Sequence, residues 1–282
     1  MRALNEPRAA RLRDAPSCKA GDKILRQAAI SQPYPFGYPA GVSGISNIVI
    51  LTGAGISAES GLATFRGPDG LWEGHRVEDV CTPEALARDP VMVHRFYDAR
   101  RAALADVEPN AAHAALARLD AQWPGELLIV TQNVDDLHER AGAKRLLHIH
   151  GELRSALCAA CGARQPWETP MLPANSAQGG FAAPQCSACD AHALRPDIVF
   201  FGEMPYQMER IEQAISRADL FVSIGTSGAV YPAAGFVRTA RHRGAGTLEL
   251  NLDPSEGSIF FDETRLGPAS ELVPSWVEEL LA

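Results

Sequence analysis

The chain has 282 residues, of which 46% are hydrophobic, and a formal net charge of −8 at pH 7. A chain of this length buries a substantial core, and one large domain with a smaller one is expected. No apolar segment approaches the roughly 20 residues that cross a membrane as a helix. The acidic balance disfavours general nucleic-acid binding, which depends on neutralising phosphates. We therefore expect a globular protein that binds neither a membrane nor nucleic acid.

Residues 1–44 are expected to be an N-terminal extension. Residues 1–30 hold seven Lys or Arg against three Asp or Glu. They contain neither a continuous apolar segment nor a cleavage site of secretory type, and their acidic residues disfavour an organelle-targeting segment. We predict a flexible extension, a folded domain at residues 45–282, and a reducing, cytoplasmic location.

From residue 45 onward, short apolar segments alternate with segments of helical pattern, which is typical of an α/β fold with a parallel sheet. Strands are predicted at Ile48–Leu51, Leu127–Val130, Leu146–Ile149, Ile198–Phe201, Leu220–Ile224 and Thr247–Leu250. Helices are predicted at Pro90–Ala105, Asn110–Gln122, Tyr206–Ser216, Pro232–His242 and Trp276–Leu281, with Asn110 and Ser275 as N-caps. A helical insertion at about residues 62–108 interrupts the alternation. The fold predicted is a Rossmann-like parallel sheet with helices on both faces.

The first predicted strand leads into Gly53-Ala-Gly55-Ile-Ser-Ala58, which has the spacing of a dinucleotide-binding turn. In such a turn the first glycine permits the bend and the second lets the backbone approach a pyrophosphate. The third small residue lets the next helix pack closely on the strand. A redox enzyme would place an acid about 20 residues further on, after a second strand. Thr64-Phe-Arg66 and the insertion stand there instead, which favours a site that consumes the dinucleotide.

Other predicted strands also end in polar or glycine residues, at Thr131–Asp135, His150-Gly151, Gly225–Ser227 and Asn251–Asp253. Open α/β sheets bind ligands outside the carboxyl ends of their strands. We therefore predict one crevice shared by all of these strand ends.

Four of the six cysteines form two C-x-x-C pairs, Cys158 with Cys161 and Cys186 with Cys189. Two such pairs favour one structural zinc ion held in a closed tetrahedral site. A redox motif is the alternative, but a redox pair belongs on a strand-to-helix turn, and neither pair is predicted there. We interpret residues 157–195 as a small inserted zinc-binding module.

Together these motifs resemble the sirtuins over residues 45–282. The resemblance rests on Gly53–Ser57, Thr64–Arg66, Thr131–Asp135, His150-Gly151, the cysteine pairs, Phe201–Glu203 and Gly225–Ser227, which stand in family order. Gly70–Trp72, Glu78–Val80 and Tyr231–Gly235 are similar to the bacterial class III branch, although Phe200 stands where many members have Trp. The resemblance implies an NAD-dependent protein-lysine deacylase. Acetyl and succinyl or malonyl groups would leave lysine, giving nicotinamide, O-acyl-ADP-ribose and free lysine.

The resemblance also implies the roles of particular residues. His150 would be the general base, a role suited to a side chain that titrates near neutrality, and Asn133 would act beside it. The implied NAD contacts are Gly53, Ala54, Gly55, Ile56, Ser57, Glu59, Ser60, Phe65, Arg66, Trp72, Gln132, Asn133, Val134, Asp135, Gly225, Thr226, Ser227, Asn251, Leu252, Asp253 and Ala269. The alternatives are a core or metal-binding His148-x-His150 pair, and plain helix caps at Asn133 and Asp135. We expect His148 to be a buried packing residue and His138 to be structural.

Substrate contacts are implied on two segments. Tyr97 and Arg100 lie three apart on one helix and share a face, and a guanidinium fork binds a carboxylate strongly. The resemblance assigns this pair to the carboxylate of an acyl chain, whereas a solvated helix face is the other interpretation of Arg100. The segment Val199, Phe200, Phe201, Gly202 and Glu203 resembles the edge that takes the substrate peptide as an added strand.

Two other functions fit the same motifs. A mono-ADP-ribosyltransferase would use the same NAD pocket with a different acceptor. A zinc-bearing, NAD-sensing adaptor would bind NAD without consuming it. We expect a monomer that acts on acylated lysines of other proteins.

Overall fold

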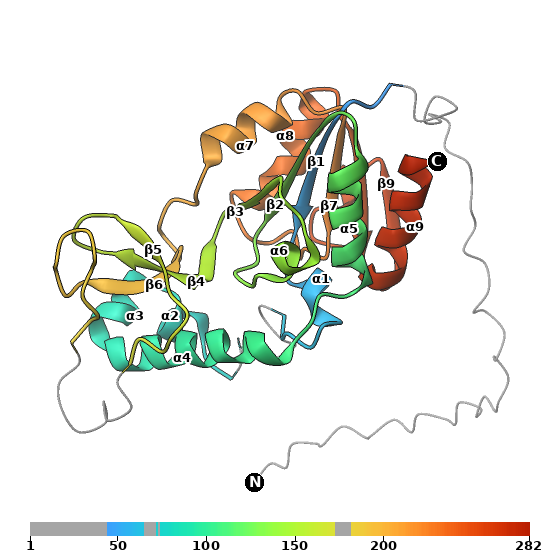
Figure 1. The fold of residues 1–282 in the computed structure, drawn as a ribbon. Helices are drawn as coiled ribbons and strands as arrows, with labels where there is room; N and C mark the ends of the chain where they lie inside the picture. The colour runs from blue at the N-terminus through green and yellow to red at the C-terminus, as the bar shows by residue number, and fades with distance from the viewer. Residues whose placement is uncertain (1–43, 65–71, 73, 173–181) are drawn as a thin grey trace, which may run out of the picture. The chain divides into compact units, whose positions relative to one another are not determined.

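Six parallel strands form the main sheet, in the order β3-β2-β1-β7-β8-β9 (Figure 1). Their bounds are β1 Asn47–Thr52, β2 Glu126–Thr131, β3 Leu146–His148, β7 Leu220–Ile224, β8 Gly246–Asn251 and β9 Glu263–Leu266. The computed structural model describes residues 44–64, 72, 74–172 and 182–282. The predicted extension, apart from Gly44, and both Phe65 and Arg66 lie outside these residues.

Helices cover both faces of this sheet. Along β1, Ile48 and Ile50 point to one face and Val49 and Leu51 to the other, as strand geometry requires. The first face packs on α5 (Ala111–Gln122) and α9 (Ala269–Leu281). The second packs on α7 (Met208–Ile215) and α8 (Phe236–His242) (Figure 1). Burial on both faces explains why the central strands are nearly continuous apolar segments. The predicted fold class is confirmed.

A second, three-stranded antiparallel sheet has the order β5-β4-β6. Its strands are β4 Gly151–Cys158, β5 Arg164–Pro166 and β6 Leu194–Ile198. Helices α2 (Val77–Val80), α3 (Pro83–Arg88) and α4 (Pro90–Ala103) share a core with this sheet, through Leu153 and Ile198. Helices α3 and α4 both begin with a proline after a capping side chain, Thr82 and Asp89 respectively.

Short elements complete the described chain. These are α1 Gly55–Ala58, α6 Leu137–Ala141, and the 3₁₀ turns η1 Leu104–Asp106, η2 Ala233–Gly235 and η3 Ser258–Phe260. None of the helices in the described residues is long and apolar enough to span a bilayer.

Two sequence predictions of elements are wrong. The strand expected at Ile198–Phe201 ends at Ile198 and belongs to the antiparallel sheet. Beyond it, the N–H groups of Val199 and Phe201 donate to the carbonyls of His150 and Cys81, outside either sheet. The last helix begins at Ala269 rather than after an N-cap at Ser275, and it continues through Pro274. Strands β4, β5 and β9 were not predicted.

The carboxylate of Asp120 ties α5 to the start of β3. It accepts from the main-chain N–H groups of Lys144 (2.5 Å) and Arg145 (3.1 Å) and from the Arg145 guanidinium (2.5 Å). Burial alone would raise the pKa of Asp120, but these donors outweigh burial and hold the pKa below its ordinary value.

Asp120→Ala should therefore lower the free energy of unfolding by about 1–3 kcal/mol, because it leaves partly buried donors without an acceptor. Urea denaturation at pH 7 measures this loss. The wild type should lose the difference as the pH falls below about 4, because the carboxyl pKa is lower in the folded state. Asp106→Ala, at an exposed carboxylate, is the control. An equal loss in both variants would contradict the assignment.

Candidate functional site

A pocket of about 780 Å³ lies at the carboxyl ends of β1, β2, β7 and β8. It is lined by all five strand ends that the sequence placed around one crevice. The pocket is also lined by α4, by β4 and by the segment that follows β6, through Arg100, Leu153 and Val199–Glu203 among others. The main sheet and the smaller antiparallel sheet thus each contribute to one site.

The turns after β1 and β7 touch backbone against backbone. Gly53 N–H donates to the Ile224 carbonyl (3.0 Å), and Gly55 N–H donates to the Gly225 carbonyl (2.8 Å). A Cβ atom on Gly53 would lie 2.8 Å from the Gly225 oxygen, and one on Gly55 would lie 2.7 Å from the Gly225 Cα. Gly225 itself has φ +62°. These glycines are needed because two turns pack on each other, apart from any contact with a ligand.

The residue in the third position of the glycine motif does not do what the sequence suggested. Ala58 is exposed and lines the pocket, and α1 is a single turn of four residues. Ile56 supplies the close packing against the sheet instead, since it is fully buried in the first core.

Ser57 is the hub of a buried hydrogen-bond network. Its hydroxyl accepts from the Asn133 side-chain amide (3.0 Å) and donates to the Asp135 carboxylate (3.1 Å). The His113 Nε2 lies 3.4 Å from the same hydroxyl, and His113 Nδ1 accepts the main-chain N–H of Asn110 (3.3 Å). Because Nδ1 accepts, the proton of the neutral ring is on Nε2, which donates to Ser57. The loop after β2 is therefore fixed to α1 through one hydroxyl.

Burial sets the charges in this network. It lowers the pKa of His113 to about 4, so the ring is neutral at pH 7. Burial also raises the pKa of the Asp135 carboxyl, against the opposing effect of donors from Leu137 N–H and Ser57. His113 was not among the site residues predicted from the sequence. Its signal was its place three residues after the N-cap Asn110, where a capping box usually has Glu or Gln.

His150 faces the pocket with one ring nitrogen held. Its Nδ1 donates to the Gln132 carbonyl (3.2 Å), which places the proton of the neutral ring there and leaves Nε2 as an acceptor. Burial lowers the pKa of His150, so the neutral form predominates at pH 7. The next residue, Gly151, has φ +89°, and a Cβ there would lie 1.9 Å from the Asp197 carbonyl oxygen. The first position of β4 therefore requires glycine, because a side chain there would overlap the Asp197 main chain.

Most of the other predicted nucleotide contacts line the same pocket. They are Gly53, Ala54, Gly55, Ser57, Glu59, Trp72, Gln132, Asn133, Val134, Asp135, Gly225, Thr226, Ser227, Asn251, Leu252, Asp253 and Ala269. Ile56 and Ser60 do not line it, because Ile56 is a core residue and the Ser60 hydroxyl accepts from Asn110 (3.0 Å). Glu59 also accepts hydrogen bonds from the N–H and hydroxyl of Ser270, at the start of α9.

Of the two residues predicted to select the acyl group, one lines the pocket and the other does not. Tyr97 is 0% exposed, does not line the pocket, and packs among Trp72, Phe96 and Phe200. Arg100 lines the pocket. Its guanidinium lies 3.4 Å from the centre of the Phe96 ring and donates to the Phe96 carbonyl (2.9 Å). Arg100 is thus the member of the pair that a ligand can reach.

Three successive N–H groups of the segment predicted to take a peptide already have hydrogen-bond acceptors within the chain. Val199 and Phe201 N–H groups donate to main-chain carbonyls, and Phe200 N–H donates to the Glu203 carboxylate (2.9 Å). An added strand would therefore have to pair through other groups of this segment. Phe201 is 38% exposed beside the pocket.

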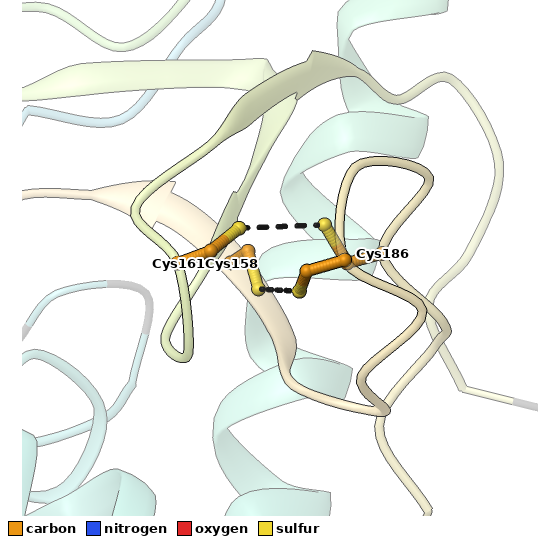
Figure 2. A group of neighbouring side chains, drawn as sticks. Cys158, Cys161 and Cys186 are labelled. Carbon is orange, nitrogen blue, oxygen red and sulfur yellow. Dashed lines mark hydrogen bonds between the residues drawn. The ribbon is translucent and has the colours of Figure 1, made fainter.

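The four paired cysteines come together as one cluster (Figure 2). The Sγ atoms of Cys158 and Cys189 lie 3.7 Å apart and those of Cys161 and Cys186 lie 3.8 Å apart. A tetrahedral zinc ion with Zn–S bonds of about 2.3 Å separates its sulfur ligands by about 3.8 Å. The cluster fits a structural zinc site. Among the described residues it is the one group of three or more possible metal ligands found together, which disfavours a His148-x-His150 metal pair.

The purified protein should therefore contain a single zinc ion. Removing it with a strong chelator should lower the thermal midpoint by about 5–10 °C, because binding energy at a structural site is folding energy. Metal analysis and thermal melting measure both effects. Cys186→Ser should lose the zinc, whereas Cys81→Ser, outside the cluster, should keep it. A metal-free protein with an unchanged midpoint would contradict the zinc assignment.

Comparison with known proteins agrees with this geometry. The model of the Sir2 family matches residues 53–232. A Caulobacter vibrioides protein named NAD-dependent protein deacylase is 53% identical over 243 residues, covering 85% of this chain and 98% of that protein. A solved Sir2 homologue–NAD complex has a TM-score of 0.75 and 36% identity, covering 85% of this chain and 91% of that one. A Sir2–p53 peptide–NAD+ complex has a TM-score of 0.69 and 28% identity, covering 84% and 95%. The chain belongs to the Sir2 family.

Proposed function

We propose that the protein is an NAD-dependent protein-lysine deacylase that removes acetyl and succinyl or malonyl groups. The observation that carries the proposal is His150, which lines the same pocket as the glycine turn and the Asn133–Asp135 loop and whose Nδ1 is held by the Gln132 carbonyl, so that Nε2 is left as an acceptor. The relative named NAD-dependent protein deacylase and the neighbour that holds NAD+ with a peptide support this assignment.

NAD, when bound, supplies the ribosyl carbon that receives the acyl oxygen as nicotinamide leaves. The chain's own residues hold the reactants and move a proton. His150 Nε2 accepts a proton from a ribose hydroxyl, and the Gln132 carbonyl keeps the ring in the tautomer that can do so. The network on Ser57 holds Asn133 and Asp135 in place beside it. One water molecule is consumed as the lysine amine is released, and the products are nicotinamide, O-acyl-ADP-ribose and lysine. Zinc has only a structural role.

Acyl selectivity is assigned to Arg100. Arg100 lines the pocket, and its guanidinium is supported from behind by the buried Phe96 ring. A succinyl or malonyl carboxylate can bind the planar guanidinium through two hydrogen bonds. Tyr97, fully buried behind this wall, supports the packing around Arg100.

His150→Ala should lower kcat for NAD-dependent deacylation by about 10²–10⁴-fold, the usual contribution of a general base. His192→Ala, at an exposed histidine of the zinc module, is the matched control and should keep full activity. Circular dichroism and thermal melting establish that both variants fold. Wild-type activity in His150→Ala would rule out the base assignment.

The wild-type pH profile provides a second test. Because burial lowers the pKa of His150, kcat/KM should rise with pH along an acid limb whose apparent pKa lies below about 6.5. An acid limb centred above that value would contradict a buried, neutral base.

Arg100→Met should lower kcat/KM for a succinyl-lysine peptide about 10–100-fold, because a charge-assisted hydrogen bond is lost. Activity on the acetyl-lysine peptide should change little. Arg95→Met, an exposed position on the same helix, should leave both activities unchanged. Parallel assays of the two peptides decide the matter, and equal losses on both would exclude a carboxylate-binding role.

A further inference from the structure

His148 was expected to be a packing residue, but its ring is fully engaged in hydrogen bonds. It is the last residue of β3 and pairs in register with Thr131 of β2. Its side chain is 6% exposed. Nδ1 lies 2.8 Å from the Asn133 main-chain oxygen, and Nε2 lies 2.7 Å from a carboxylate oxygen of Glu139, in α6. The ring therefore joins a surface carboxylate to the main chain of the Asn133 loop.

Both partners of this ring can only accept hydrogen bonds. A peptide carbonyl has no proton to give, and neither has a carboxylate. To satisfy both, the imidazole must carry a proton on each nitrogen and so be an imidazolium. His150 differs because its Nδ1 donates to a carbonyl while Nε2 faces the pocket, and His113 differs because its Nδ1 accepts an N–H. Geometry alone thus separates His148 from the two neutral histidines.

The contact with His148 completes the attachment of Asn133. The Asn133 N–H donates to the Thr131 hydroxyl (3.1 Å), and its side-chain amide donates to the Ser57 hydroxyl (3.0 Å). The Asn133 carbonyl is the third fixed point, and His148 is its donor. Loss of this donor frees the peptide that sets the direction of the Asn133 side chain.

The charges around the ring favour its cationic form. Glu139 lies on one side, Glu152 of β4 is nearby and is paired with Arg164 of β5, and Asp135 belongs to the adjacent loop. His138 of α6 is neutral, because burial and the neighbouring histidines lower its pKa, and Lys144 lies at the same surface hollow. Burial alone would lower the pKa of His148, but the hydrogen bond and charge of Glu139, followed by the Asn133 carbonyl and Glu152, raise it above its ordinary value.

We propose that His148 is a pH-dependent positioning residue, which as an imidazolium anchored by Glu139 holds the Asn133 peptide from outside the pocket. This inference rests on the proposed deacylation. Because the folded-state pKa is raised, the contact is fully present below about pH 6.5 and is lost as the pH rises through the folded-state value. A neutral ring keeps its one proton toward the Glu139 carboxylate, the stronger acceptor. The Asn133 carbonyl then loses its donor.

Glu139→Gln is the decisive variant, since a glutamine amide can donate to Nε2 of a neutral ring. That ring then keeps its proton on Nδ1, toward Asn133, at every pH. For the wild type, kcat/KM for NAD should fall about tenfold between pH 7 and pH 9, the effect of one charge-assisted hydrogen bond. In Glu139→Gln the decrease should be largely abolished. The matched control is Glu126→Gln, at an exposed strand end, which should behave as the wild type. The same decrease in all three proteins would overturn the proposal.

A second variant and a readout without turnover keep the test independent of the proposed function. His148→Leu should raise the KM for NAD about tenfold at pH 7 and remove the alkaline limb. In ¹H–¹³C spectra, the His148 ring should titrate above about pH 6.5 in the wild type and lower in Glu139→Gln. The Val134 amide resonance, which reports on the Asn133 carbonyl, should titrate with it only in the wild type. The inference would be overturned if the wild-type His148 ring titrated below pH 6.5, or if the Val134 amide resonance did not change as that ring titrated. Either result would count even if the protein deacylated no substrate. An inactive wild type would instead contradict the proposed function.

Discussion

The contact between the turns after β1 and β7 is the constraint on which the site depends. Gly53, Gly55 and Gly225 bring two main chains so close that a Cβ on any of them would overlap the other turn. This contact lies where the strand order reverses between β1 and β7, which is where open α/β sheets form ligand crevices. The pocket floor is therefore made of backbone, and its position follows from sheet topology together with three glycines.

Three histidines then fix the loop that follows β2, each in a protonation state set by its partners. His113 accepts an N–H and donates to Ser57, and is neutral. His150 donates to a carbonyl and keeps an acceptor toward the pocket. His148 faces two acceptors. The difference between the three rings comes from their hydrogen-bond partners rather than from their positions in the sequence.

Much of the fold and of the pocket could be predicted because local signals sufficed. Buried strands such as Ile48–Leu51 are continuous apolar segments, and the two C-x-x-C pairs identify their own cluster. The segment Ile198–Phe201 was wrongly predicted as a strand of the main sheet because it is equally apolar. The N–H groups of Val199 and Phe201 instead bond to His150 and Cys81, which are distant in sequence. The spacing of His113 from Asn110 indicates its capping contact but not its contact with Ser57. His148 acquires its role only when the fold brings Asn133 and Glu139 to its ring. Contacts of this second kind leave no trace in spacing or composition.

In the proposed reaction, the pocket couples NAD cleavage to removal of an acyl group from lysine. The most direct measurement follows nicotinamide and free lysine together, in one reaction of the full chain with NAD and an acyl-lysine peptide. Both products should form in equal amounts, and neither should form with an unmodified peptide. Release of nicotinamide without an acylated peptide, with ADP-ribose transferred to protein, would contradict the proposed reaction and indicate a mono-ADP-ribosyltransferase.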